Sequence, residues 1–145
     1  MATIAEHVKA RAADGEHVAI RFEDQTMTWA EYVEACTTRA AYLQATLDAG
    51  APPHVGVLFD NITEFSMWLG AAALIGAVVV GINPTRRGAE LARDITHTDC
   101  QLVITEGRHR HLLDGLDLGV AGDRVLDVES EQYAAALAPH AGSPI

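Results

Sequence analysis

The sequence predicts an α/β fold in which helices cover both faces of a mostly parallel β-sheet, preceded by a small β-hairpin. Short apolar runs with the character of buried strands recur along the chain, and longer segments with helical spacing separate them. The links between these segments are short, as in successive βαβ units. The 145 residues, of which 49% are hydrophobic and 21% charged, have the size and composition of a compact domain.

The first predicted elements are the hairpin and a long amphipathic helix. Residues 18–22 (VAIRF) alternate in polarity, residues 23–25 can turn, and an extended segment resumes at residue 26. Thr28 and Glu31 have the spacing of a capping box, so we expect a helix from Thr28 to about Asp48. Gly50 is its expected C-terminal glycine.

The remaining strands and helices alternate. Asn83-Pro84 is expected to end one strand, and Ser130 is expected to cap the last helix. We assign residues 138–145 to a loop or frayed tail, because Pro139 and Pro144 disfavour regular structure. The expected strands are 54–59, 78–82, 101–105 and 124–128, and the expected helices are 63–76, 85–98, 108–113 and 130–137.

Charge and composition exclude several classes of protein. The formal net charge is −10, which disfavours binding to nucleic acid or to an anionic membrane. The longest apolar run, residues 67–82, contains three glycines and is shorter than a transmembrane helix requires. The N-terminus lacks the pattern of a signal peptide, and Cys36 and Cys100 are too few and too far apart for a disulfide framework. We therefore expect a cytoplasmic protein with reduced thiols.

Four consecutive segments resemble one family in the correct order. They are MTWAEYV at 27–33, VGVLFDNITEFSMWLGA at 55–71, GAAALIGAVVVGINPT at 70–85, and ELARDITHTDCQLVIT at 90–105. Together they resemble the opening part of the adenylate-forming (AMP-binding) acyl-CoA synthetases. The stretch at 83–87 is more similar to fatty-acyl-CoA synthetases than to peptide-synthetase adenylation domains. Gly81 and Ile75 depart from the family pattern, where proline and a basic residue are frequent.

The resemblance implies a ligase that joins a fatty acid or another carboxylic acid to coenzyme A through an acyl-adenylate, using Mg-ATP. The family's phosphate loop ends in Lys-Gly and its C-terminal lid carries another lysine, whereas Lys9 is the one lysine in this sequence. We therefore expect residues 1–137 to be an incomplete N-terminal subdomain that is inactive alone. We assign it no catalytic, cofactor-binding or metal-binding residue.

Two other interpretations stay open. The chain could be a standalone scaffold or dimerising module derived from this family, forming a homo-oligomer through an exposed apolar face. It could also be an unrelated nucleotide binder of flavodoxin type, although no glycine-rich loop or acidic metal cluster supports that interpretation.

Several side chains have both a functional and a structural interpretation. Asn61 and Asn83-Pro84 follow predicted strands and could shape an active site, but turn formation explains them as well. The apolar side chains of Phe65, Met67 and Trp68 could line an acyl pocket, but core packing is the favoured interpretation.

The potential metal ligands and charged residues are also given structural interpretations. The spacing of His97, Cys100, His109 and His111 does not match a standard zinc pattern, so we expect solvated histidines. Cys36 is expected on the apolar face of a helix without an activating base. Arg86-Arg87 are interpreted as a solvated helix start, and Glu106 and the Glu129–Glu131 run as helix-start charges.

Overall fold

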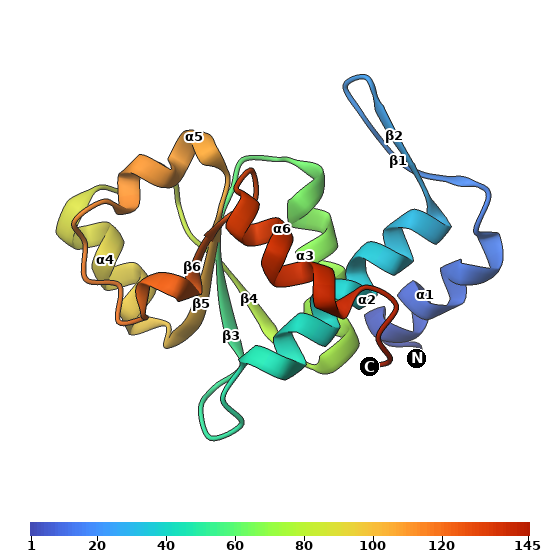
Figure 1. The fold of residues 1–145 in the computed structure, drawn as a ribbon, viewed down its shortest axis with the longest axis horizontal. Coiled ribbons are helices and arrows are strands. Elements are labelled where there is room, and N and C mark those ends of the chain that lie inside the picture. The colour runs from blue at the N-terminus through green and yellow to red at the C-terminus, as the bar shows by residue number, and fades with distance from the viewer. The chain divides into compact units, whose positions relative to one another are not determined.

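The chain contains two compact units, each described by itself. The computed structural model describes all 145 residues. Unit 1 consists of residues 1–46, 62–76 and 137–145, and unit 2 of residues 47–61 and 77–136 (Figure 1). The sequence suggested one subdomain over residues 1–137 and did not anticipate this division. The predicted α/β class with a parallel sheet and a separate hairpin is confirmed.

Unit 1 is built from helices and the hairpin. Its N-terminal helix was missed by the sequence analysis, although Thr3 and Glu6 form a capping box in which the Thr3 backbone N–H donates to Glu6 at 2.6 Å. The regular elements of unit 1 are α1 (Ile4–Ala10), β1 (Val18–Phe22), β2 (Gln25–Thr28), α2 (Trp29–Thr46) and α3 (Thr63–Ile75), with 3-10 turns at Arg11–Asp14 and Ala138–His140.

The predicted hairpin and the predicted start of α2 are both confirmed. β1 and β2 pair antiparallel, and Glu23 in their turn has a φ of 53°. The Thr28 N–H donates to the Glu31 carboxylate at 2.7 Å, and the Glu31 N–H donates to the Thr28 hydroxyl at 3.3 Å. This reciprocal pair is the capping box expected from the sequence.

The predicted C-terminal glycine of α2 is wrong, although the helix ends within two residues of the expected Asp48. The helix stops at Thr46, and Gly50 does not cap it. Asp48 forms a turn of its own instead, because its carboxylate accepts the Gly50 N–H at 2.8 Å and its carbonyl accepts the Ala51 N–H at 3.2 Å. Aspartate side chains compete in this way with continued helical hydrogen bonding.

The C-terminal segment of unit 1 is more structured than the loop or tail expected at 138–145. Ala138–His140 form a 3-10 turn, and the His140 ring meets Tyr42 edge to face at 5.6 Å. The Gly142 N–H donates to the Glu34 carboxylate at 3.1 Å. These contacts hold the segment against α2, which residue composition alone did not indicate.

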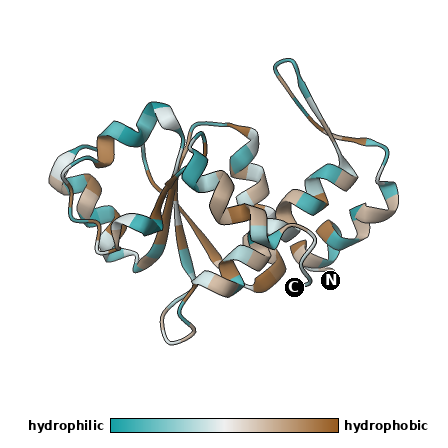
Figure 2. Cartoon of the chain, viewed as in Figure 1, coloured by the Kyte–Doolittle hydropathy of each residue, from teal (hydrophilic) through white to brown (hydrophobic).

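Unit 2 is a parallel sheet of four strands in the order β4-β3-β5-β6. Leu91 and Ile95 of its amphipathic helix α4 are fully buried and pack in one cluster with Leu58 and Val103 of the sheet and with Ile82, which follows β4. Figure 2 shows the central strands as hydrophobic and α5 as mainly hydrophilic. The elements are β3 (His54–Leu58), β4 (Val78–Gly81), α4 (Gly88–His97), β5 (Cys100–Thr105), α5 (Gly107–Arg110), a 3-10 turn at His111–Leu113, a 3-10 turn at Gly122–Arg124, β6 (Val125–Asp127) and α6 (Glu131–Leu137).

The helices of unit 2 differ from prediction mainly at one N-terminus. α4 begins at Gly88, three residues later than expected, and Gly88 has a φ of 53°, which favours glycine. Ser130 precedes α6 as expected, and its hydroxyl accepts the Tyr133 N–H at 3.1 Å. None of the helices combines the length and apolarity needed to cross a membrane.

Candidate functional site

A cluster of two carboxylates and an imidazole lies at the carboxyl ends of β3 and β5. Asp60 follows β3 and Glu106 follows β5, and Leu58 is the register partner of Thr105. The two strands are parallel neighbours, so the residues that follow them meet at the same edge of the sheet. Ligands of open α/β folds commonly bind at this edge.

The local fold brings His109 to the two carboxylates. Its Nε2 atom lies 2.9 Å from Asp60 Oδ1 and 3.4 Å from Glu106 Oε1. Glu106 Oε1 also accepts the backbone N–H of Asp60 at 2.5 Å. The first turn of α5 places His109 beside Glu106. The His109 N–H donates to the Glu106 carbonyl at 3.0 Å, so the two side chains lie one turn apart.

The cluster is shielded from solvent on one side and open on the other. Only 10% of the Glu106 side chain and 14% of the His109 side chain are exposed, compared with 39% of Asp60. Arg108 lies on the open side, with Nη1 2.8 Å from Asp60 Oδ2. The hydrogen bond with His109, aided by the charges of His109 and Arg108, lowers the pKa of the Asp60 carboxyl. Asp60 is therefore ionised at neutral pH.

Further carboxylates make this edge of the sheet acidic. Asp127 ends β6, and its carboxylate accepts the Glu129 N–H at 2.9 Å. A methyl group added at Gly107 would meet the Glu129 carboxylate, which shows that this flexible side chain lies beside the start of α5. These carboxylates would repel a phosphate group brought to this edge of the sheet.

The structure confirms one expectation about these charged residues and corrects another. Glu106 directly precedes α5, as expected of a helix-start charge, and it is 8% exposed. The His109 side chain is only 14% exposed, so the expectation of a solvated histidine is wrong here. Four residues were considered as metal ligands from their sequence spacing: His97, Cys100, His109 and His111. Of these, only His109 lies in a cluster of potential metal ligands. Asp60 and Glu106 each come one or two residues after an apolar strand, which is the sequence signal that was available and overlooked.

Structural roles account for the remaining candidates at the strand ends. The Asn83 side-chain oxygen accepts the Thr85 N–H at 2.9 Å and the Thr85 hydroxyl at 2.8 Å, as turn formation requires. Arg86 and Arg87 directly precede α4, at its solvated start as expected, and the 40% exposed Arg86 side chain reaches Glu90 at 3.2 Å and Asp94 at 3.1 Å. Asn61 is exposed and follows Asp60 in a bend.

The core interpretation of the apolar candidates is also supported. Trp68 has no exposed surface and Met67 is 6% exposed. The Trp68 ring meets Tyr42 edge to face at 6.5 Å, inside unit 1. Phe65, on the same helix, is partly buried. These residues pack the protein's interior, as their helical spacing indicated.

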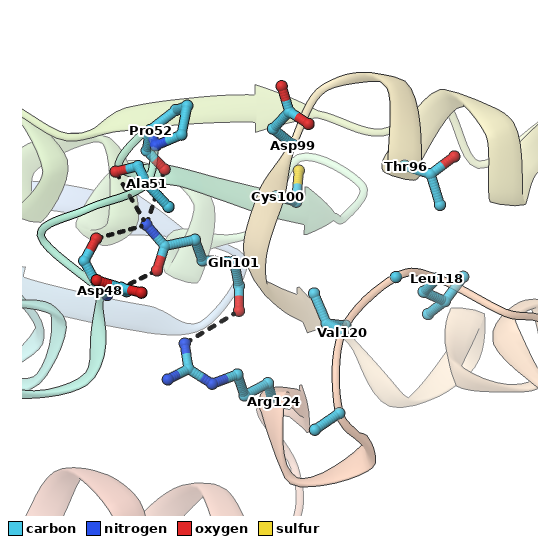
Figure 3. Close-up of a pocket in the computed structure, with 12 residues that line it drawn as sticks. Asp48, Ala51, Pro52, Thr96, Asp99, Cys100, Gln101, Leu118, Val120 and Arg124 are labelled. Carbon is cyan, nitrogen blue, oxygen red and sulfur yellow. Dashed lines mark hydrogen bonds between the residues drawn. The ribbon is translucent and has the colours of Figure 1, made fainter.

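A cavity of about 600 Å³ lies at the opposite, amino-terminal end of β5 and β6 (Figure 3). The Gln101 amide in its wall donates to the carbonyls of Asp48 at 3.1 Å and Pro52 at 2.8 Å, while its oxygen accepts the Asp48 N–H at 2.7 Å. The Gln101 carbonyl accepts a hydrogen bond from Arg124 at 3.3 Å. The hydrogen bonds of the Gln101 amide therefore hold the loop before β3 in place. The role of this wall of the cavity is structural.

Neither thiol is arranged for nucleophilic chemistry. Burial raises the pKa of the Cys36 thiol to about 11, and burial also raises the pKa of Cys100. We therefore predict that both thiols react with a disulfide reagent at pH 8 far more slowly than a free cysteine. The control is the urea-unfolded chain, in which two thiols should react rapidly. A fast stoichiometric reaction of the folded protein would contradict the buried, protonated assignment.

Comparison with known proteins decides the family. The sequence pattern of the AMP-binding enzyme family matches residues 7–144. The chain belongs to the AMP-binding enzyme family. This finding confirms the resemblance that was based on the motifs at 27–33 and 70–85.

Relatives in the family are acyl-CoA ligases. The chain is 45% identical over 139 residues to steroid-22-oyl-CoA synthetase of Rhodococcus jostii, which covers 96% of this chain and 25% of that protein. It is 41% identical over 126 residues to the medium/long-chain-fatty-acid–CoA ligase FadD17 of Mycobacterium marinum, covering 87% of this chain and 24% of that protein. The chain thus spans about a quarter of the length of these relatives.

Solved structures support the same fold. The N-terminal domain of FACL13 from Mycobacterium tuberculosis matches 99% of this chain and 38% of that chain, with a TM-score of 0.82 at 22% sequence identity. At this level of identity the match shows the fold and carries no functional detail.

Proposed function

We propose that this chain forms part of an ATP-dependent acyl-CoA synthetase. The observation that carries the proposal is the 45% identity to a steroid-22-oyl-CoA synthetase over 96% of the chain. In the proposed reaction, a carboxylate oxygen attacks the α-phosphate of Mg-ATP and pyrophosphate leaves. The thiol of coenzyme A then attacks the acyl carbon and AMP leaves, so the products are acyl-CoA, AMP and pyrophosphate.

The proposed contribution of this chain is scaffolding. The carboxyl edge of its sheet carries Asp60, Glu106, Asp127 and Glu129, which disfavour a triphosphate. Lys9, the one lysine, lies just before the end of α1 and follows no glycine-rich loop. We assign no step of the ligase reaction to these residues, and we infer that the chain alone is inactive.

The inactivity of the isolated chain is tested by an assay of pyrophosphate release. The purified chain is incubated with Mg-ATP, coenzyme A and either a steroid carboxylic acid or a long-chain fatty acid. We expect release no faster than in the same mixture without protein. Release that depends on both the acid and the chain would overturn this part of the proposal.

The family function is tested with a chimera. The segment of the Rhodococcus jostii synthetase that aligns with this chain is replaced by the chain itself. We expect the chimera to form a coenzyme A thioester, whereas the same host with the segment deleted should form none. A chimera that folds, as judged by circular dichroism, but makes no thioester from a steroid acid or a fatty acid would count against the proposal.

An interaction module is the second candidate function, favoured by apolar side chains on the surface. Leu69 on α3 is 50% exposed, and Val78 on the edge strand β4 is 47% exposed. Light scattering on the isolated chain should show a dimer if these surfaces pair copies of the chain. A monomer at high concentration removes this candidate and leaves the synthetase proposal unaffected.

The proposed location is the cytoplasm. Cys36 and Cys100 are both free and buried, which fits a reducing compartment. Fluorescence microscopy of the tagged chain, or fractionation of the cells that produce it, tests this location.

A further inference from the structure

The donor atoms at the carboxyl edge of the sheet have the spacing of a metal site. His109 Nε2 lies 2.9 Å from Asp60 Oδ1 and 3.4 Å from Glu106 Oε1, and all three donor atoms lie within 4.8 Å of one another. Ligand atoms bound tetrahedrally at about 2.0–2.1 Å from a zinc ion are separated from each other by about 3.3 Å. The three side chains can therefore surround one ion with small rotations.

The scaffold holds these donors in place. Asp60 and Glu106 follow neighbouring parallel strands, and the Glu106 N–H donates to the Leu58 carbonyl at 3.4 Å. Arg108 contacts Oδ2 of Asp60 at 2.8 Å, so the other oxygen, Oδ1, faces His109. Neighbours that orient a ligand from outside are a regular feature of protein metal sites.

The charge balance of the cluster favours a cation. Two carboxylates approach the same imidazole nitrogen, and the Glu106 side chain is only 10% exposed. Arg108 is 69% exposed and reaches Asp60 on its outer side. A buried carboxylate is costly unless it is paired or bound to a metal. A dication between the two carboxylates would offset their repulsion directly.

We propose that Asp60, Glu106 and His109 bind one divalent first-row transition-metal ion, with zinc as the reference ion. The imidazole nitrogen favours zinc and its neighbours over calcium and magnesium, which prefer oxygen ligands throughout. Three protein ligands leave one position for water. The bound ion would join the end of β3 to the start of α5. This site is independent of the proposed ligase function and of its Mg-ATP.

The main alternative is a metal-free ion pair in which His109 carries a proton. Both arrangements place the imidazole against the same carboxylates, so binding measurements must distinguish them. The whole 145-residue chain is treated with a chelator, dialysed, and titrated with zinc chloride by calorimetry. We expect one ion per chain and a higher thermal midpoint with zinc. Cobalt(II) should give visible absorption bands without thiolate charge transfer, because the thiols lie outside the cluster.

Variants locate the site. His109→Ala and Glu106→Gln should each weaken zinc binding by at least about tenfold, since even outer-shell partners have effects of this size. His111→Ala is the matched control: it removes an exposed histidine two positions away that is outside the cluster. It should leave the affinity unchanged.

A third variant keeps the test decisive if one of these does not fold. Asp60→Asn changes the most exposed of the three side chains and should also weaken binding at least about tenfold. Circular dichroism checks that each variant is folded. The proposal is overturned if the wild-type chain binds no zinc, or if folded variants of the cluster bind zinc as tightly as the wild type. Loss of binding in His111→Ala with retention in Glu106→Gln overturns it as well.

Discussion

Replacing Glu64 by alanine is expected to destabilise the protein by about 3–5 kcal/mol, the usual result of removing one partner from a buried ion pair. Arg39 of α2 is 7% exposed. Its Nη2 and Nε atoms lie 2.6 Å and 3.1 Å from the two carboxylate oxygens of Glu64 on α3. The guanidinium cannot deprotonate when this carboxylate is removed, so a buried charge loses its counter-ion. Urea unfolding followed by circular dichroism measures the loss.

A surface pair in the same chain provides the control for this prediction. Arg86 and Glu90 are 3.2 Å apart, but their side chains are 40% and 66% exposed. Glu90→Ala should therefore change the unfolding free energy by at most about 1 kcal/mol. If Glu64→Ala is no more destabilising than Glu90→Ala, then leaving the buried Arg39 charge without its counter-ion does not cost the expected free energy of unfolding.

The elements that could be predicted from sequence are those determined by neighbouring residues. Thr28 and Glu31 are three positions apart, so their capping box is visible in the sequence and forms as expected. The turn that follows α2 depends in addition on a partner far along the chain, because Asp48 hydrogen-bonds to Gln101. No periodicity within residues 28–50 contains that information.

The candidate site could not be predicted from the sequence, because its residues also lie far apart along the chain. Asp60 and His109 are 49 positions apart, and Asp60 and Glu106 are 46 positions apart. They meet only because β3 and β5 are neighbours in the sheet, with Leu58 beside Thr105. Sequence reasoning identified both strands but not their pairing, and it therefore compared His109 with histidines nearby in sequence. The order of parallel strands is the information that pattern analysis lacked.

Gly70→Ala is expected to destabilise the protein by about 1–2 kcal/mol, although alanine is the better helix former by about 1 kcal/mol. Gly70 lies on α3, and a methyl group there would come within 2.5 Å of Cys36 Sγ and 3.0 Å of the Tyr32 hydroxyl on α2. The tyrosine cannot move freely, because its hydroxyl donates to the Ser66 carbonyl at 3.0 Å. Overpacking costs about 1–3 kcal/mol, and an approach of 2.5 Å places this substitution in the upper part of that range, about 2–3 kcal/mol. A net loss of about 1–2 kcal/mol therefore remains after the gain in helix propensity. Urea unfolding measures the net change.

Two further variants separate steric conflict from a general effect of losing glycine. Gly81→Ala places the same methyl group in open space, so it should be neutral or slightly stabilising. Cys36→Ala removes the sulfur that the methyl group at position 70 would strike. The double variant Cys36→Ala/Gly70→Ala should therefore be more stable than the sum of the two single changes predicts, with a coupling energy of about 1 kcal/mol. If the changes in unfolding free energy of the two single variants simply add, contact with Cys36 is not the cause of the destabilisation. Close packing of α2 on α3 would then not explain why position 70 carries glycine.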